Sequence, residues 1–329
     1  MRNNKHAGYK LQALDFIDRA FKQDPNQQVT EIAKNVADEL DIEYNDSFRR
    51  QVSRWVEVYK DKKIREKSFD AVKYQKDGFE LNLPDGDQEI DIESVTLPAR
   101  LNRIGVLSDI HFPYHDRDVL ATALKYIKDF GANAIILNGD IVDCYQLSSF
   151  AKDPLARSFK YEIDLVKAFF AELRRIFGDI EILYSIGNHE VRFERFMMDK
   201  ASELKGLIDI EDIFGFNEYR IKHVPSEAFI KAGDLNILHG HETKVGGSTN
   251  HARNTMIKTG VSTLFGHFHR TQESLSKNLN GKVYGAYATG CMCKLKPKYM
   301  PINGWNHGFA TVELEKGGNF EVDNRKMFL

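Results

Sequence analysis

The segment Ile104-Gly-Val-Leu-Ser-Asp-Ile-His111 is an apolar run that ends in two polar side chains, Asp109 and His111. A strand with such a run is typically buried on both faces, as in a parallel sheet. Its C-terminal end then lies at the edge where open α/β sheets place their ligands. Side chains alternate along an extended chain, so Asp109 and His111 point to the same side, and a carboxylate beside an imidazole is typical of a metal site. Asp-x-His is a common pattern, and this segment alone leaves open a strand end with two unrelated polar residues.

Four further apolar runs along the chain also end in polar side chains. They lie at residues 133–140, 181–190, 235–241 and 261–269, and they lead to Asp140 and Asp143, Asn188 and His189, His239 and His241, and His267 and His269. Helices expected at 117–130 and 160–177 separate the first three of the five runs, and this βαβαβ pattern predicts a parallel sheet with right-handed crossovers. Four of the five runs have an adjacent glycine, which lets the backbone approach a metal cluster closely.

The donors collected at these strand ends are too many for one tetrahedral ion, and they include no thiolate. They are Asp109, His111, Asp140, Asn188, His239, His267 and His269. Oxygen and imidazole donors in this number predict two divalent ions that share a bridging carboxylate. A vestigial site in a DNA-binding or structural protein is disfavoured, because a decayed site should have lost a ligand.

The motifs also resemble a known family. The set Asp109-x-His111, Gly139-Asp140-x-x-Asp143, Gly187-Asn188-His189-Glu190, His239-Gly240 and Gly266-His267-x-His269 resembles the calcineurin-like metallophosphoesterase superfamily. The resemblance covers residues 102–315 and implies a four-layer α/β/β/α sandwich with a dimetal centre at the strand ends. Cys144 follows Asp143 at the position where phosphoprotein phosphatases carry arginine, and this difference disfavours that subclass. The segments near Gly290 and Trp305 are similar to those of phage-encoded phosphoesterases.

The resemblance implies a role for each residue of the motifs. Asp109, His111, Asp140 and His269 hold the first ion, Asp140 bridges, and Asn188, His239 and His267 complete the second. His239 is preferred to His241 because it directly ends the apolar strand and occupies the family's ligand position. His189 is the catalytic non-ligand histidine near the leaving group, and Asp143 orients a ligand imidazole. A hydroxide that bridges the two ions attacks the phosphoester. We expect Mn²⁺, with Fe, Zn, Ni or Mg as alternatives.

Other polar side chains near these motifs are candidates for substrate contacts. They are His115, Arg192, His241, Trp305 and His307. Arg192 has a helix-surface position as its favoured alternative interpretation. Residues 294–307 form a basic, aromatic loop that suits a stacked base or a backbone phosphate, and the alternative is a surface loop with one buried tryptophan.

The N-terminal segment predicts a small all-α unit. Apolar spacing indicates a helix at 9–23 and two further helices that begin near residues 30 and 46, an arrangement that fits a helix-turn-helix unit. Residues 47–67 carry eight basic and three acidic side chains, a net charge of +5. This predicts phosphate contacts by Arg49, Arg50 and Arg54. The alternative is a scaffold or a protein-docking module.

We therefore expect a helix-turn-helix-like domain at 1–67, a β-hairpin linker at 68–100 and a catalytic domain at 101–329. In the linker, residues 79–83 should pair with 89–97, and residues 284–290 and 308–314 should lie in the second sheet. The expected activity is that of a phosphodiesterase or nuclease on DNA, RNA or nucleotides. The alternative is a phosphomonoesterase acting on a phosphoprotein or a small metabolite, with the N-terminal unit as a docking module.

Composition limits the setting of the protein. The formal net charge of the 329 residues is −2, so any nucleic-acid surface must be local. Three cysteines give no even disulfide framework, which predicts a reducing cytoplasm, that of the host if the protein is phage-encoded. Cys291-x-Cys293 has no partner cysteines, and we interpret it as two small strand residues and not as a zinc knuckle. Signal-peptide and transmembrane patterns are absent, so no membrane partner is expected, and the sequence predicts no oligomeric state.

Overall fold

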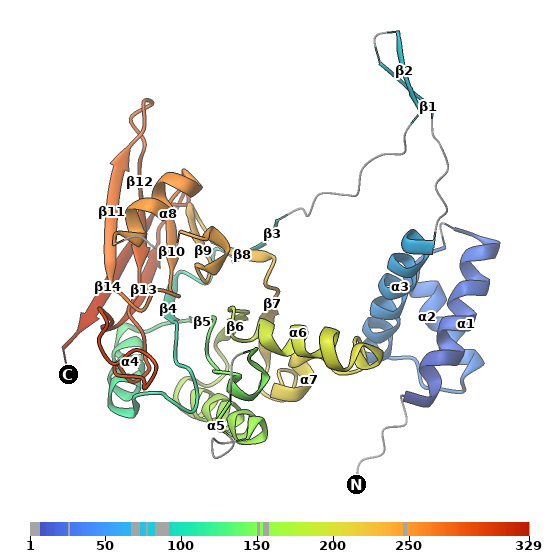
Figure 1. The fold of residues 1–329 in the computed structure, drawn as a ribbon, viewed down its shortest axis with the longest axis horizontal. Coiled ribbons are helices and arrows are strands. Elements are labelled where there is room, and N and C mark those ends of the chain that lie inside the picture. The colour runs from blue at the N-terminus through green and yellow to red at the C-terminus, as the bar shows by residue number, and fades with distance from the viewer. Residues whose placement is uncertain are drawn as a thin grey trace. The chain divides into compact units, whose positions relative to one another are not determined.

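The computed structural model describes residues 7–25, 27–66, 73–76, 78–82, 92–149, 152–153, 158–245 and 249–328. The chain divides into two compact units, and the larger comprises Asp91–Glu203 and Asp209–Leu329 (Figure 1). Among the described residues, no helix has both the length and the apolar character needed to cross a membrane.

The smaller unit contains three helices, α1 (Ala7–Gln23), α2 (Val29–Glu39) and α3 (Asp46–Glu66). All three contribute to one apolar core, which includes Ala13, Ile17, Ile32, Val36, Val52 and Trp55. The side chain of Asn45 accepts a hydrogen bond of 2.9 Å from the N–H of Phe48, which satisfies a free donor in the first turn of α3. The three expected helices are therefore present.

Residues 68–100 contain a hairpin, but the expected pairing of residues 79–83 with 89–97 is wrong. Strand β2 (Phe79–Asn82) pairs antiparallel with β1 (Lys73–Lys76), and residues 83–91 lie outside the described part of the chain. Strand β3 (Glu93–Thr96) pairs in parallel with β8 (Ala228–Ala232) of the larger unit. The alternation in β3 belongs to a sheet-edge strand, and the residue after it, Leu97, is buried between the two sheets.

The first sheet of the larger unit has the order β14-β13-β4-β5-β6-β7. Its parallel strands are β4 (Arg103–Leu107), β5 (Ala134–Asn138), β6 (Glu181–Ser185) and β7 (Ile221–Val224). Helices α4 (Arg117–Phe130) and α5 (Phe159–Phe177) connect β4 to β5 and β5 to β6, as expected. Strand β13 (His307–Leu314) pairs antiparallel with β4 and with β14 (Phe320–Met327), so its expected place in the second sheet is wrong.

The second sheet has the order β11-β12-β10-β9-β8-β3. Its further strands are β9 (Leu235–Ile237), β10 (Thr263–Phe265), β11 (Gln272–Lys277) and β12 (Val283–Ala288). The remaining helices are α6 (Val191–Lys200), α7 (Ile210–Phe214), α8 (His251–Thr259) and the short 3₁₀ segments η1 (Tyr145–Leu147), η2 (Ser202–Leu204) and η3 (His241–Thr243).

Three apolar clusters lie between the layers of the larger unit. One face of the first sheet packs its alternate residues, such as Leu137, against α4 and α5. The opposite face, with Ile136, packs against Ile230 and Ile237 of the second sheet. The outer face of the second sheet, with Phe265, packs against α8. This is the expected α/β/β/α sandwich, and because apolar side chains alternate in direction, each sheet is buried on both faces.

Candidate dimetal centre

The C-terminal ends of β4, β5, β6, β9 and β10 carry all of the expected ligand residues. Backbone hydrogen bonds continue past the end of the first sheet and hold two of these loops together. The N–H of Asp109 donates to the carbonyl of Gly139 at 3.1 Å, and the N–H of His111 donates to that of Asp140 at 2.9 Å. The loops therefore place their side chains in a common space between the sheets.

Five residues of the site have a left-handed backbone conformation, which residues other than glycine rarely adopt. Positive φ angles, between 52° and 69°, occur at Asp109, His111, Asp140, His267 and His269. Such left-handed residues are uncommon outside glycine, and they concentrate at sites where the surrounding structure fixes them for function. The strain indicates that these loops are shaped to bring side chains together.

The first cluster consists of Asp109, His111 and His269, whose ligand atoms all lie within 4.8 Å of one another. Nε2 of His269 is 3.2 Å from Oδ1 of Asp109 and 3.2 Å from Nε2 of His111. The Nδ1–H of His111 donates to the carboxylate of Asp143 at 3.1 Å, which leaves the lone pair of Nε2 directed into the cluster.

The second cluster consists of Asp140, His239 and His267, also within 4.8 Å. The Nδ1–H of His239 donates to the carbonyl of Asn138 at 2.7 Å, so its Nε2 carries the lone pair and lies 3.3 Å from Oδ2 of Asp140. The same Oδ2 is 3.7 Å from Nε2 of His111 in the first cluster. Asp140 thus lies between the two clusters.

Several buried oxygen and nitrogen atoms that could bind a metal make no hydrogen bond within the described structure. They are Asn188 Oδ1, His239 Nε2, His267 Nδ1 and Asp109 Oδ1. Buried polar atoms are almost always paired, and a cation would satisfy unpaired lone pairs that converge with carboxylates. The donor set therefore fits a dimetal site.

Charge in the site also suits cations. Burial acts to raise the pKa of Asp140, but the imidazoles of His239 and His189 outweigh it and hold that pKa well below its usual value. Burial and the nearby His239 lower the pKa of His267 to about 4, which keeps its imidazole neutral. Ionised carboxylates and neutral imidazoles are the forms that bind metal. The nearby carboxylates outweigh burial and raise the pKa of His239, and they raise that of His269 to about 10, so a cation would displace a proton from these two imidazoles.

His189 lies beside the clusters in a hydrogen-bonded group with Asp143 and Arg192. Its Nδ1–H donates to the carbonyl of Asp143 at 2.9 Å and is 3.1 Å from the carboxylate. Arg192, in the first turn of α6, donates to the same carbonyl at 2.9 Å and to Nε2 of His189 at 3.0 Å. Arg192 therefore belongs to the site and is not a free helix-surface arginine.

Glu190 holds the loops in place, a role that sequence reasoning missed. This fully buried carboxylate accepts hydrogen bonds from the Tyr184 hydroxyl at 2.6 Å and from backbone N–H groups at 2.8–3.3 Å, those of Asp140, Ile141, Val142 and Gly187. It joins the loop after β5 to the loop after β6. Its position directly after Gly187-Asn188-His189 was the available signal.

Two glycines are required by close approach, as the sequence predicts. A Cβ atom added at Gly187 would lie 2.4 Å from the backbone nitrogen of Asp140, and one added at Gly266 would lie 2.5 Å from Oδ2 of Asp109. Both positions are too tight for any side chain.

The candidate substrate residues differ in their surroundings. The ring centroid of Trp305 is 4.1 Å from that of His269, and the His241 ring is 5.4 Å from His239. His307 is buried and donates through Nε2 to the carbonyl of Cys293 at 3.0 Å, which indicates a structural role. His115 packs against Phe112 with ring centroids 4.5 Å apart.

The candidate nucleic-acid residues lie on α3 of the smaller unit. Arg50 and Arg54 are exposed and Arg49 is half-buried. Arg49 and Arg50 each contact Asp46 at 3.3 Å, through its carboxylate and its carbonyl respectively.

Two buried clusters of carboxylates and imidazoles that share Asp140, at strand ends in a four-layer sandwich, define a metal-dependent phosphoester hydrolase. The chain matches the model of the calcineurin-like phosphoesterase family over residues 102–281 and belongs to that family, which confirms the resemblance.

Two mycobacteriophage proteins are among its relatives. The chain is 26% identical over 249 residues to the Gene 54 protein of Mycobacterium phage L5, covering 68% of this chain and 97% of the relative. It is 27% identical over 254 residues to that of phage D29, covering 67% and 96%.

Similar solved structures include Chaetomium thermophilum Vps29, with 13% identity, a TM-score of 0.34 and coverage of 68% of this chain and 97% of that one. A dimetal phosphatase from Danio rerio has 11% identity, a TM-score of 0.37 and coverage of 69% and 96%.

Proposed function

We propose that this enzyme is a phosphodiesterase that acts on nucleic acid or nucleotides. Asp109, His111, Asp140 and His269 would hold one divalent ion, and Asn188, His239 and His267 would complete the second, with Mn²⁺ as the ion. The observation that carries the proposal is the position of Asp140 between two clusters in which buried ligand atoms, those of Asp109 Oδ1, His239 Nε2 and His267 Nδ1, have no hydrogen bond in the described structure.

Two bound divalent cations would neutralise a phosphoester and lower the pKa of a coordinated water. The side chains beside them supply the remaining chemistry. Burial acts to lower the pKa of His189, but the carboxylates of Asp140 and Asp143 outweigh it and raise that pKa. Nε2 accepts a hydrogen bond from Arg192 in the structure, so a proton taken up at Nε2 would replace that hydrogen bond and would then be available for the leaving oxygen. Asp143 holds the ring in place, and the Arg192 guanidinium can bind a phosphate oxygen.

Aromatic and basic side chains in the segment 294–305 support a diester of nucleic acid. Tyr299 is 78% exposed, and its ring centroid lies 6.4 Å from that of Trp305, which packs on His269. Exposed rings beside a phosphate site can stack a base. Lys296 and Lys298 are exposed in the same segment and suit the flanking phosphates, whereas the exposed Lys294 pairs with Asp116 at 2.6 Å.

The helical unit supports the same class of substrate. Exposed Arg50 and Arg54 on α3 offer guanidinium groups for backbone phosphates. The likeness to mycobacteriophage proteins supports a role in the cytoplasm of an infected bacterium. The second candidate function is a phosphomonoesterase on a phosphoprotein or a metabolite, in which this unit docks the substrate.

A hydrolysis panel tests the proposal. The Mn²⁺-loaded protein should hydrolyse bis-p-nitrophenyl phosphate faster than p-nitrophenyl phosphate, and it should cleave at least one of single-stranded DNA, duplex DNA and RNA. Asp140→Asn serves as the control for contaminating activity. Equal or faster monoester turnover with no cleavage of nucleic acid would contradict the diesterase proposal and favour the monoesterase.

A further inference from the structure

Cys291 and Cys293 lie beside the first cluster and not within a strand. Strands β10 and β12 are parallel, with Phe265 opposite Ala288. Because the two chains leave the sheet at the same edge, the loop after β12 places the cysteines next to His269, which follows β10. All three side chains are buried. The interpretation of the cysteines as small strand residues is therefore wrong, since β12 ends at Ala288.

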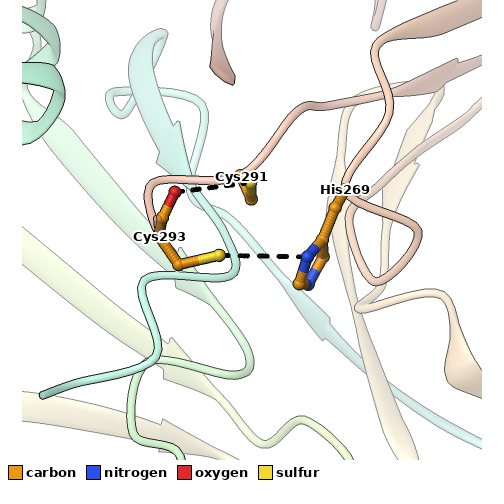
Figure 2. Close-up of side chains that lie close together, drawn as sticks. All are labelled: His269, Cys291 and Cys293. Carbon is orange, nitrogen blue, oxygen red and sulfur yellow. Dashed lines mark hydrogen bonds between the residues drawn. The ribbon is translucent and has the colours of Figure 1, made fainter. Parts of the chain in front are cut away.

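The two sulfurs of this loop converge with one imidazole nitrogen of His269, as Figure 2 shows. Sγ of Cys293 is 3.9 Å from Nδ1 of His269, and the ligand atoms of all three residues lie within 4.8 Å of one another. In a tetrahedral site with metal–sulfur bonds of about 2.3 Å and metal–nitrogen bonds of about 2.0 Å, neighbouring ligands are roughly 3.5–3.8 Å apart. A small inward rotation of the side chains would close the site.

The loop that carries the cysteines is fixed on both sides. The N–H of Cys291 donates to the carbonyl of Asn306 at 3.0 Å, and the N–H of Met292 donates to that of Asp109 at 3.0 Å. A Cβ atom at Gly290 would lie 2.4 Å from the Asn306 carbonyl, so the loop packs without spare space. The ligand geometry is therefore built into the backbone.

We propose that His269 Nδ1, Cys291 Sγ and Cys293 Sγ form a third metal site, which takes one thiophilic divalent cation such as Zn²⁺. Two sulfur ligands select a softer ion than the carboxylates and imidazoles of the dimetal centre. Binding would form two metal–sulfur bonds and one metal–nitrogen bond, and it would release the two thiol protons to solvent. If Nε2 of His269 also holds the first ion, the ring would lose its remaining N–H proton as well and would bridge the two sites as an imidazolate.

The two centres share one side chain. Nε2 of His269 lies 3.2 Å from Asp109, and its Nδ1 faces Cys293. The double role of His269 rests on the proposed function, because it requires the dimetal centre. The assignment of Cys291 and Cys293 as metal ligands does not require it. Occupancy of the cysteine site would fix the orientation of a ligand of the first cluster.

Cadmium titration tests the site directly. The full-length protein is titrated with Cd²⁺ in excess Mn²⁺ and a non-thiol reductant, and thiolate-to-cadmium absorption is followed in the ultraviolet. We expect it to saturate at one Cd²⁺ per chain, to disappear in the Cys291→Ser Cys293→Ser variant, and to persist in Cys144→Ser, which alters a buried cysteine outside the cluster. It should also persist in Asp140→Asn, so failure of the dimetal centre and failure of the cysteine site are distinguishable.

Several outcomes would overturn the proposal. They are the absence of saturable absorption in the wild-type protein, its persistence in the double serine variant, and its loss in Cys144→Ser. X-ray absorption of the wild-type protein with one equivalent of Zn²⁺ needs no variant. Sulfur scattering at about 2.3 Å would support the site, and a shell of nitrogen and oxygen alone would refute it.

Discussion

The carboxylate of Asp143 lies 3.1 Å from Nδ1 of His189, and the backbone carbonyl of the same aspartate accepts the Nδ1–H at 2.9 Å. One residue thus fixes both the tautomer and the orientation of the imidazole. Nε2 of His189 consequently lies 3.8 Å from Oδ2 of Asp140, toward the two clusters. The ligand atoms of His189, His111 and Asp140 lie within 4.8 Å of one another, so metal content decides between a proton donor and a metal ligand.

Replacing His189 should separate catalysis from metal binding. In His189→Gln we expect turnover to fall by about 10²–10⁴-fold, the usual contribution of a positioned acid or base. Metal content, measured by elemental analysis after dialysis, should stay at the wild-type value. His223→Gln serves as the control, because His223 lies on β7 and forms a hydrogen bond with Glu211. Loss of metal with unchanged turnover in the loaded protein would instead make His189 a ligand.

Glu190 should contribute to the stability of the fold, because it joins the loops after β5 and β6. Glu190→Gln removes the charge that strengthens five hydrogen bonds and turns an amide donor toward backbone donors. We expect the free energy of unfolding to fall by about 1.5–3 kcal/mol, the contribution of a hydrogen bond to a charged group. Tyr184→Phe removes one of the five and should cost about 1.5 kcal/mol, the lower end of the same range. Denaturant unfolding measures both variants, and equal stability of Glu190→Gln and wild type would refute the role.

Glu162 should make stability depend on pH. Burial and the nearby Asp143 raise its pKa to about 8 from 4.5. The folded state therefore keeps a proton that the unfolded chain has lost, and the free energy of unfolding falls as pH rises from about 4.5 to about 8. Glu162→Gln should remove this part of the slope, which chemical denaturation at a series of pH values would measure. Identical profiles for the two proteins would exclude the raised pKa.

The arginines of α3 should set the salt dependence of nucleic-acid binding. Replacing Arg50 and Arg54 together by glutamine should lower the slope of log affinity against log salt by about one for each lost phosphate contact. Replacing Lys22 and Lys34, exposed lysines of the same helical unit, removes the same charge and should have a smaller effect. Equal slopes for the two double variants would contradict phosphate binding by Arg50 and Arg54 and would indicate that the helical unit is a scaffold.

The catalytic part of the fold could be predicted because its signals are local. Each buried strand of the βαβαβ segment is one apolar run, and each ends in its own polar motif. Strand pairing was harder, because β3 pairs with β8 and β13 pairs with β4, partners that are far apart in sequence. The role of Glu190 depends on backbone N–H groups that converge only in the folded chain, and the cysteine cluster depends on His269 in a neighbouring strand's loop.

The most direct test of the dimetal account is hydrolysis of bis-p-nitrophenyl phosphate by Asp140→Asn at saturating Mn²⁺. Asp140 lies between the two clusters, and an amide cannot supply the negative charge of a bridging carboxylate. We predict that the substitution abolishes hydrolysis while the protein stays folded by circular dichroism. Hydrolysis at the wild-type rate would contradict the dimetal centre.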